Sequence, residues 1–270
     1  MPVIGAYLVP GTPLPYLVQD NPPWSPIVDG YRRAAASLAE KKPDVLLVYS
    51  TQWIAVLDEL WQTRRRVQGL HVDENWYAYG DLPYDLSIDT SLAKACVRGC
   101  AALGIKAKAV DYDGFPIDTG TIVAANFLNP GGKIPMVIAA NNLYHDPGLT
   151  EKLARMAVKT ANRQKKRVAV IGVGGLSGTI FRKEINIAKD KIASAVDDKA
   201  NKKLLGLMRR GDSAGLRKYL PAYASAVRAD MGMKHLNWIM GALQWRFDSA
   251  KLHAYGPSYG SGAAVVEFNR

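Results

Sequence analysis

The stretch from Arg167 to Phe181, RVAVIGVGGLSGTIF, places a cluster of glycines directly after an apolar run. The apolar run is typical of a buried strand, and glycines after it allow backbone amides to approach a ligand closely. In dinucleotide-binding proteins such a loop holds a pyrophosphate at the N-terminus of the following helix. A nucleotide is therefore the first ligand to consider for Gly172, Gly174, Gly175 and Gly178.

The nucleotide interpretation fails on spacing. The third glycine of the dinucleotide motif should stand at the sixth position, where the sequence has Ser177. The motif also requires a second strand with an acidic residue about 20 positions later, whereas residues 180–198 are charged and helix-like. A tight glycine turn between a strand and a helix is favoured, and a nucleotide-binding enzyme stays as a weaker alternative.

The histidines and Ser177 match no other catalytic motif. The four histidines lack the spacing of a zinc site, so each is expected to be a surface or core residue; they are His71, His145, His235 and His253. Ser177 lacks the flanking glycines of the G-x-S-x-G nucleophile motif. These residues predict neither a zinc centre nor a serine nucleophile.

The acidic and cysteine residues suggest structural roles. Asp111, Asp113 and Asp118 lie close together, but no Glu closes a calcium loop, so a solvated acidic turn is expected. Cys96 and Cys100 are four residues apart on an expected helix, a spacing unsuited to a disulfide. We expect two buried free thiols in a reducing compartment.

Composition indicates a soluble globular protein. Of 270 residues, 48% are hydrophobic and 22% are charged, and no apolar run approaches the ~18 residues that a membrane span needs. The N-terminus lacks a basic start and is broken by prolines, so no targeting sequence is expected. These features predict a cytoplasmic protein that does not interact with membranes.

The net charge of +11 raises the question of an acidic partner. The dense basic runs, Arg64–Arg66 and Arg163–Arg167, are not interleaved with aromatic residues as in nucleic-acid-binding proteins. We therefore expect no nucleic-acid ligand, and interpret the basic residues as solvated faces or as contacts with a more acidic subunit.

Strands alternate with helices along the chain, which predicts a single α/β domain over residues 1–270 with a central, mostly parallel sheet covered by helices. Strands are expected at 2–9, 44–50, 133–140, 167–173 and 262–268, and helices at 25–42, 89–104, 147–166, 235–247 and over much of 180–227. Ser25 is the expected N-cap of its helix. Residues 53–87 are expected to be irregular and residues 106–132 to be mainly loop.

Four separated stretches together resemble the class III extradiol ring-cleavage dioxygenases. They are LVPGTPLP near the N-terminus, KKPDVLLVYSTQW, GVGGLSGTIF and GMKHLNWIMGAL. The resemblance spans most of the chain, from residue 3 to the closing YGPSYGSGAAVVEF. It implies that the chain shares the family fold, a single α/β domain with a central sheet.

The resemblance also implies where an iron site would lie. Family members bind iron through a His after the first strand, a His after the second and a Glu before an N-W pair. Gly11, Trp53 and Lys234 stand at or near those positions. A further His, which assists proton transfer and oxygen activation in the family, is replaced by Gly178.

The replacing side chains cannot form a 2-His-1-carboxylate iron site. Glycine offers no side-chain donor, the tryptophan indole only donates a hydrogen bond, and a lysine ammonium carries no lone pair. The resemblance therefore implies no catalytic, cofactor-binding or metal-binding residue in this chain, with Gly11, Trp53, Gly178 and Lys234 as vacated positions. His235 would be the one substitute ligand if the register were shifted by one residue.

Some family members pair a catalytic subunit with a related subunit that lacks the iron site. Resemblance to such an alpha subunit implies that a homologous beta subunit binds Fe(II), in an α2β2 heterotetramer that serves aromatic-compound catabolism. The aromatic residues of residues 53–84 are equally candidates for the subunit contact and for a cover over the chain's own pocket; the most prominent are Trp61, Trp76, Tyr77 and Tyr79.

A second hypothesis is that the vacated pocket binds a small molecule, as a sensor or as an enzyme with different chemistry. In that case Lys234 would bind an anionic ligand and His145 would face the pocket.

Overall fold

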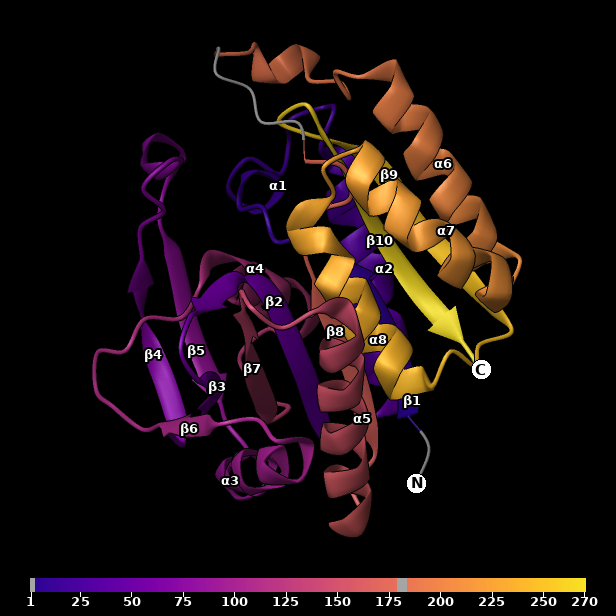
Figure 1. Cartoon of the computed structure of the whole chain (residues 1–270). Coiled ribbons are helices and arrows are strands. Elements are labelled where there is room, and N and C mark those ends of the chain that lie inside the picture. The colour runs from indigo at the N-terminus through magenta and orange to yellow at the C-terminus, as the bar shows by residue number, and fades with distance from the viewer. Residues whose placement is uncertain (1–2, 179–183) are drawn as a thin grey trace.

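An eight-stranded sheet runs through the part of the chain that the computed structural model describes, residues 3–178 and 184–270 (Figure 1). Its order is β6-β3-β7-β2-β8-β1-β10-β9. The strands are β1 (Val3–Val9), β2 (Val45–Ala55), β3 (Glu59–Gln62), β6 (Ala107–Val110), β7 (Met136–Asn142), β8 (Val168–Val173), β9 (Ser249–Ser258) and β10 (Ser261–Asn269). A separate antiparallel hairpin is formed by β4 (Arg66–His71) and β5 (Leu82–Ser87).

The centre of the sheet is parallel. Strands β7, β2, β8 and β1 pair side by side in parallel, whereas β10 and β9 add an antiparallel edge and β3 pairs antiparallel with β7. The central strands are apolar along nearly their whole length because helices cover both faces. The predicted α/β fold with a mostly parallel sheet is confirmed.

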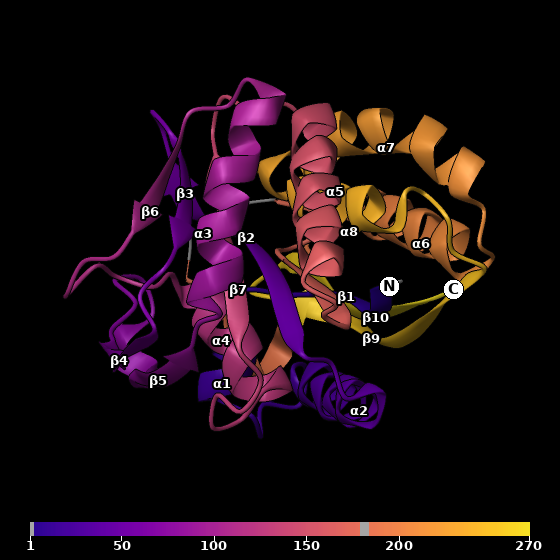
Figure 2. The same ribbon diagram turned by 90° about the horizontal axis from the view of Figure 1, so that it is seen from below.

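Helices form a layer on each side of the sheet (Figure 2). One face packs against α2 (Ser25–Lys41) and α4 (Thr119–Leu128). The other packs against α3 (Thr90–Cys100), α5 (Pro147–Arg163) and α8 (Lys234–Leu243), with α6 (Ala195–Arg209) and α7 (Ser213–Ala226) beside them. The short elements are α1 (Leu14–Leu17), η1 (Tyr77–Tyr79), η2 (Ala101–Leu103), η3 (Ile187–Lys189) and η4 (Asp230–Met233).

The helical stretch expected over much of 180–227 is confirmed in its later part, where α6 and α7 lie. Its first residues, 180–183, lie outside the described residues.

Aspartate caps fix where three helices begin. The carboxylates of Asp89, Asp118 and Asp146 accept hydrogen bonds from backbone amides three residues later, at the starts of α3, α4 and α5. The prediction that Ser25 caps α2 is wrong: Ser25 is the first helical residue, and Trp24 precedes it without a side-chain cap.

Two regions are more ordered than the sequence suggested. Residues 53–87, expected to be too irregular for a single element, contain the end of β2 together with the short strands β3, β4 and β5. Residues 106–132 contain β6 and α4, although we expected mainly loop. The strands β3 and β6 are four residues long and lie toward a sheet edge, where a hydrophobic pattern is weak.

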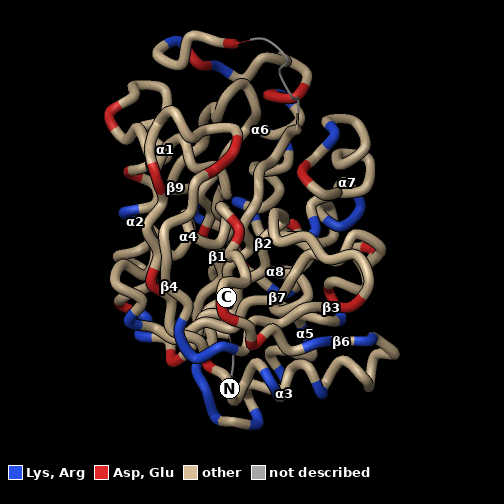
Figure 3. The backbone as a smooth tube through the Cα atoms, turned by 90° about the vertical axis from the view of Figure 1, so that its left-hand side faces the viewer, with Lys and Arg blue, Asp and Glu red and all other residues tan. Residues whose placement is uncertain are grey.

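Lys and Arg are dispersed rather than gathered in one stripe. Figure 3 shows them on several separate elements, among them α3, α7 and β6, interspersed with acidic residues. Three arginines of the dense basic runs form ion pairs: Arg64 with Asp113, Arg66 with Asp85 and Arg167 with Asp44.

No helix among the described residues has the length and apolar character needed to cross a bilayer.

Cys96 and Cys100 are free and buried, as predicted. Both lie on α3 and pack in the hydrophobic core on that side of the sheet. Burial raises the pKa of the Cys100 thiol to about 12, and it also raises the pKa of Cys96. Neither thiol is therefore a nucleophile at neutral pH.

Candidate functional site

A cavity of about 930 Å³ opens at the carboxyl ends of β1, β2 and β8. Loops after parallel strands meet at this edge of the sheet, which is where α/β proteins commonly bind ligands. The cavity is lined from four sides by Gly11 after β1, Gln52 in β2, the glycine loop after β8, and the η4 turn with Asp230. Three of the stretches that carry the family resemblance, those with Gly11, Gln52 and the glycine loop, therefore meet at this cavity.

Gly11 lines this cavity, and its surroundings leave little room for a larger residue. A Cβ atom at Gly11 would lie 3.1 Å from the Gln52 Nε2 atom, 3.1 Å from the Gly120 Cα atom and 3.2 Å from a Val173 methyl group. The Gln52 amide donates a hydrogen bond to the Gly11 carbonyl at 3.2 Å. The position at which the resemblance puts the family's first iron-binding His therefore lacks a side-chain donor and is tightly packed.

The residue of β2 that faces the cavity is Gln52, and Trp53 faces the opposite way. Trp53 is buried, with its ring in an edge contact with Phe115 at 6.3 Å between centroids. Successive residues of a strand point to opposite faces, so one of the two must turn from the cavity. Trp53 thus packs in the core, and Gln52 supplies an amide where the resemblance placed a metal ligand.

The glycine loop donates its amides to the protein itself. The amides of Gly174, Leu176 and Gly178 donate to the carbonyl oxygens of Val9, Gly262 and Val227, respectively. The Gly175 amide donates to the Asp230 carboxylate at 2.8 Å. A carboxylate of the chain therefore lies where the nucleotide interpretation requires a phosphate, which leaves that alternative without support.

Gly178 is held where a side chain cannot fit. A Cβ atom there would meet the backbone carbonyl oxygen of Arg228 at 2.3 Å, closer than real Cβ contacts come. The neighbouring Ser177 is buried, and its hydroxyl accepts hydrogen bonds from the Gly262 amide and the Asn201 side chain. At the position where the resemblance puts the family's proton-transfer His, close backbone packing thus leaves no room for a side chain. The Ser177 hydroxyl is used within the fold.

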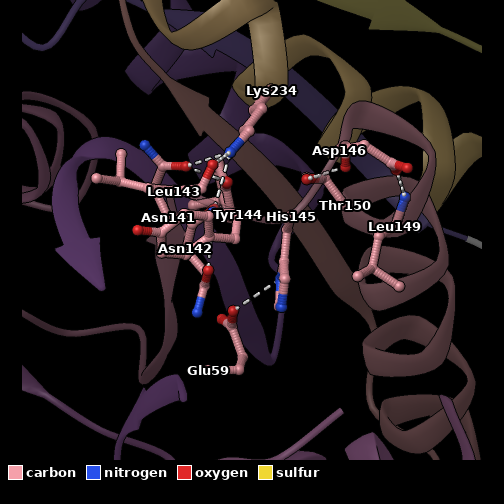
Figure 4. Close-up of polar contacts among 11 residues, drawn as sticks. Glu59, Asn141, Asn142, Leu143, Tyr144, His145, Asp146, Leu149, Thr150 and Lys234 are labelled. Carbon is pink, nitrogen blue, oxygen red and sulfur yellow. Dashed lines mark hydrogen bonds and ion pairs between the residues drawn. The ribbon is translucent and has the colours of Figure 1, made fainter. Parts of the chain in front are cut away.

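Lys234, at the start of α8, points toward the end of β7 (Figure 4). Its ammonium donates to the carbonyl oxygen of Asn142 at 2.8 Å, to that of Leu143 at 3.3 Å and to the side-chain oxygen of Asn141 at 3.3 Å. Lys234 is not among the described residues that line the cavity. It therefore does not offer a charge to a ligand there.

Glu59 and His145 complete a buried polar cluster with Lys234 (Figure 4). The Nδ1 atom of His145 lies 3.3 Å from Oε2 of Glu59, whose side chain is fully buried. Burial raises the pKa of Glu59 well above its usual range, although the Lys234 ammonium opposes the shift. Burial and Lys234 lower the pKa of His145, and burial lowers the pKa of Lys234.

His235 does not substitute for a missing iron ligand. Its side chain is fully buried behind the glycine loop, where a Cβ atom at Gly174 would lie 2.8 Å from the His235 Nδ1 atom. Burial lowers the pKa of this imidazole, and the Asp230 carboxylate opposes that effect. Its ring is separated from the cavity by the packed glycine loop.

These donors do not fit Fe(II). Of the positions that the resemblance assigns to iron ligands, Gly11 has no side chain, the Trp53 indole lies in the core, and the Lys234 ammonium donates hydrogen bonds to the end of β7. An iron site of this family requires imidazole and carboxylate ligands. Among residues 3–178 and 184–270, no three His, Cys, Asp or Glu side chains are grouped so as to hold a metal ion. The chemistry open to the cavity is therefore that of its amides, hydroxyls and carboxylates.

A second, smaller cavity of about 440 Å³ continues from the first and shares Gln52, Trp76 and Asp230 with it. Asp118, Asp73 and Glu74 line it. The expectation that Asp118 belongs to a solvated acidic turn is wrong, because it caps α4 and accepts hydrogen bonds from Ser50 and Thr121. Asp111 and Asp113 are exposed, as expected for a turn.

The aromatic residues between β2 and β5 divide between the core and the cavity. Trp61 is fully buried. Trp76 lines both cavities and packs edge-on against Tyr259 at 4.6 Å between ring centroids. Tyr77 and Tyr79 are exposed, with 68% and 36% of their surfaces accessible. Trp76 therefore fits the alternative of a pocket cover, and Tyr77 stays available for a subunit contact.

The site residues that sequence reasoning missed are Gln52 and Asp230. The Asp230 carboxylate accepts hydrogen bonds from the Thr51 hydroxyl at 2.8 Å and from Gly175. It lies four residues before Lys234, in a turn where Met231, Gly232 and Met233 all have positive φ. A non-periodic turn of this kind carries no sequence signal that marks the Asp as a cavity residue.

Comparisons with known proteins agree with the geometry. Residues 5–268 match the family model described as the catalytic LigB subunit of aromatic ring-opening dioxygenase. The chain is 50% identical over 270 residues, all of both chains, to the 2-aminophenol 1,6-dioxygenase alpha subunit of a Pseudomonas species. It is 28% identical over 288 residues to the beta subunit from Pseudomonas, covering 99% of this chain and 94% of the relative.

A solved structure supports the fold. An uncharacterized protein of Escherichia coli K12 superposes with a TM-score of 0.64 at 14% identity, covering 97% of this chain and 98% of the other. This likeness concerns the fold alone, while the family model and the full-length relatives carry the relationship. From the match to the family model and from the full-length relatives, it follows that the chain belongs to the LigB family of class III extradiol dioxygenase subunits.

Proposed function

We propose that this chain is the non-catalytic alpha subunit of a 2-aminophenol 1,6-dioxygenase. In this proposal, a homologous beta subunit binds Fe(II) and opens the ring of 2-aminophenol to 2-aminomuconate 6-semialdehyde. The alpha chain stabilises that subunit in a complex that serves aromatic-compound catabolism. Full-length identity of 50% to an alpha subunit, against 28% to a beta subunit, supports the assignment.

One observation carries the proposal that this chain is not itself catalytic. None of the positions that the resemblance singles out offers an iron ligand: Gly11 and Gly178 have no side chain and are tightly packed, and the Lys234 ammonium donates to backbone carbonyls. Trp53 is turned into the core. The cavity beside Gly11 and Gly178 is open, but these positions supply no imidazole or carboxylate that could bind iron.

The proposed assembly is an α2β2 heterotetramer without nucleic acid or membrane partners. Subunits of obligate complexes bury large apolar areas, and their stability then depends on the partner. Residues 1–270 are proposed to act in it as one domain, which is supported by the pairing of β1 with β10 within one sheet.

The test is to purify the chain alone and together with a coexpressed beta-type subunit, both anaerobically with added Fe(II). We expect the chain alone to bind less than about 0.1 equivalent of iron, as an order-of-magnitude limit for a site without ligands, and to consume no oxygen with 2-aminophenol. The copurified complex should bind iron and turn over. Stoichiometric iron and oxygen uptake by the chain alone would overturn the proposal.

A second candidate function is binding of a small molecule in the vacated cavity, and the cavity of about 930 Å³ favours it. Pockets of this size accommodate drug-sized ligands. The two functions are compatible, because a subunit can stabilise its partner and retain a ligand site. Calorimetric titration of the chain with small aromatic compounds tests this candidate. If none of the compounds gave a heat of binding, the ligand-binding function would be excluded.

A further inference from the structure

Exposed apolar side chains gather in one region of the surface. Twelve large hydrophobic residues are exposed in the part of the chain that the structure describes, and nine of them belong to this region. Five stand at or just after the ends of β2 and β7, namely Ile54, Val56, Leu57, Leu143 and Tyr144. Four stand on the β4–β5 hairpin, namely Leu70, Val72, Tyr77 and Tyr79. We call these nine residues the apolar surface.

The strand ends and the hairpin adjoin. Strands β2 and β7 are neighbours in the sheet, and the Leu143 amide donates to the carbonyl oxygen of Ala55 at 2.9 Å. Ile54 lines the smaller cavity together with His71, which precedes Val72 in the chain. The two groups of the apolar surface therefore meet near Ile54.

The apolar surface is larger than a monomer ordinarily exposes. A fully exposed large side chain offers about 200 Å², so the exposed fractions, which reach 88% at Leu57 and 80% at Tyr144, give roughly 1,000 Å² in total. Monomeric proteins rarely expose an apolar patch above about 600 Å², whereas a stable interface covers about 800 Å² on each partner. The area therefore fits a subunit interface.

The segment that carries Leu143 and Tyr144 is held in place by polar contacts (Figure 4). The Lys234 ammonium donates to the carbonyl oxygen of Leu143 at 3.3 Å, and the Tyr144 amide donates to the side-chain oxygen of Asn142 at 3.0 Å. Segments that only connect two elements are ordinarily the more mobile parts of a protein. Apolar side chains that are fixed in advance lose less freedom on binding, which favours association.

We propose that the apolar surface is the contact face for the homologous beta-type subunit, an inference that rests on the proposed function. A second copy of this chain is disfavoured as the occupant, because each copy carries a net charge of +11 and high net charge opposes self-association. The contact has its apolar centre at the ends of β2 and β7, and the β4–β5 hairpin extends it. Trp76 is not among the nine residues and stays a pocket residue.

The test replaces the two most exposed members of the apolar surface, in the double variant Leu57→Ser/Tyr144→Ser. The variant is coexpressed with a tagged beta-type subunit, and dissociation of the isolated complex on dilution is followed by sedimentation. We expect the complex to be weakened at least about tenfold, as for residues at the centre of an interface. The variant chain alone should keep its melting temperature, because both side chains point into solvent.

The matched control is Tyr112→Ser/Val196→Ser. These side chains are 72% and 70% exposed, but Tyr112 follows β6 and Val196 lies in α6, outside the apolar surface. The control should assemble as the unmodified chain does. Hydrogen exchange of the unmodified complex provides a second measurement, in which backbone amides of residues 54–57 and 143–144 should become protected on assembly while those of residues 112–114 should not.

Equal dissociation constants for the double variant, the control and the unmodified chain would overturn the proposal. So would a homodimer of this chain that the double variant disrupts while the complex with the beta-type subunit persists. If the unmodified chain does not copurify with the beta-type subunit, the proposed function fails together with this inference. If it copurifies and the double variant assembles equally well, only the assignment of the surface fails.

Discussion

The ammonium of Lys234 donates a hydrogen bond to the carbonyl oxygen of Asn142 at 2.8 Å, across the sheet end between α8 and β7. The sequence resemblance puts an iron-binding Glu of the family at the Lys234 position. Here the same position joins two elements of the fold, so a residue type that would repel a metal ion has become part of the structure. Its contribution to stability can be measured.

Replacing Lys234 with Met should lower the free energy of unfolding by about 2–3 kcal/mol. The change leaves the carbonyls of Asn142 and Leu143 without their donor and removes the cation nearest to buried Glu59. Urea unfolding measures the loss. Lys108→Met is the control, since Lys108 is exposed and its surface ion pair with Asp58 should contribute under about 1 kcal/mol. Equal losses in both variants would contradict a special role for Lys234.

Glu59→Gln should become relatively more stable than the unmodified chain as pH rises. Unfolded Glu59 ionises near its ordinary pKa of 4.5, whereas burial raises its pKa in the folded chain. The folded chain therefore binds the extra proton above pH 4.5, and its stability falls as pH rises through that window. Urea unfolding of both proteins at about pH 5 and about pH 8 measures the difference. A stability difference between the two proteins that does not depend on pH would show that burial does not shift the pKa of this carboxyl group.

Glu267 should contribute stability that is lost in acid. Burial alone would raise its pKa, but hydrogen bonds from Ser37, His253 and Lys41 hold the pKa below its usual value. Stability from such a group is present above the unfolded pKa, near 4.5, and is lost as pH falls through the folded pKa. Between about pH 7 and about pH 3, the free energy of unfolding should therefore fall more steeply with decreasing pH for the unmodified chain than for Glu267→Gln. Parallel pH profiles would refute this.

Restoring the family ligands should not restore an iron site. In a variant with Gly11→His, Trp53→His and Lys234→Glu, the first His would be crowded by Gly120 and Val173, and the second would face the core beside Phe115. Anaerobic Fe(II) titration should give no stoichiometric binding, and a catalytic family member treated identically serves as the positive control. Tight binding of one equivalent of iron would mean that these positions still converge.

Gly178→Ala should destabilise the chain by about 1–3 kcal/mol, the usual cost of overpacking. The added Cβ would lie 2.3 Å from the Arg228 carbonyl oxygen, and backbone must move to relieve the contact. Gly114→Ala is a comparison of a different kind, since Gly114 has positive φ but open space around its Cβ position. Thermal unfolding should show a lower melting temperature for Gly178→Ala than for the unmodified chain, and this difference should persist when salt and pH are varied. An unchanged melting temperature would contradict the packing argument.

The sequence determined the elements whose signal is local. The apolar runs that became β1, β2, β7 and β8 and the helices α2, α3 and α5 were predicted, because a buried strand or an amphipathic helix carries its own pattern. The family was also recognisable, since its framework motifs survive in order. The short edge strands β3 and β6, the strand β9 and the Thr- and Gly-rich α4 were missed, because tertiary packing supplies most of their stability.

Only the tertiary structure decided whether the side chain of each site residue faces the cavity, the core or another element. Gln52 and Trp53 are neighbours in β2, and the twofold alternation of a strand sends one to the cavity and the other to the core. The phase of α8 likewise turns Lys234 to β7, while the irregular η4 turn brings Asp230 to the glycine loop. A sequence records which residue stands at a position. The face that it occupies depends on register and helix phase, which are fixed when distant segments pack together.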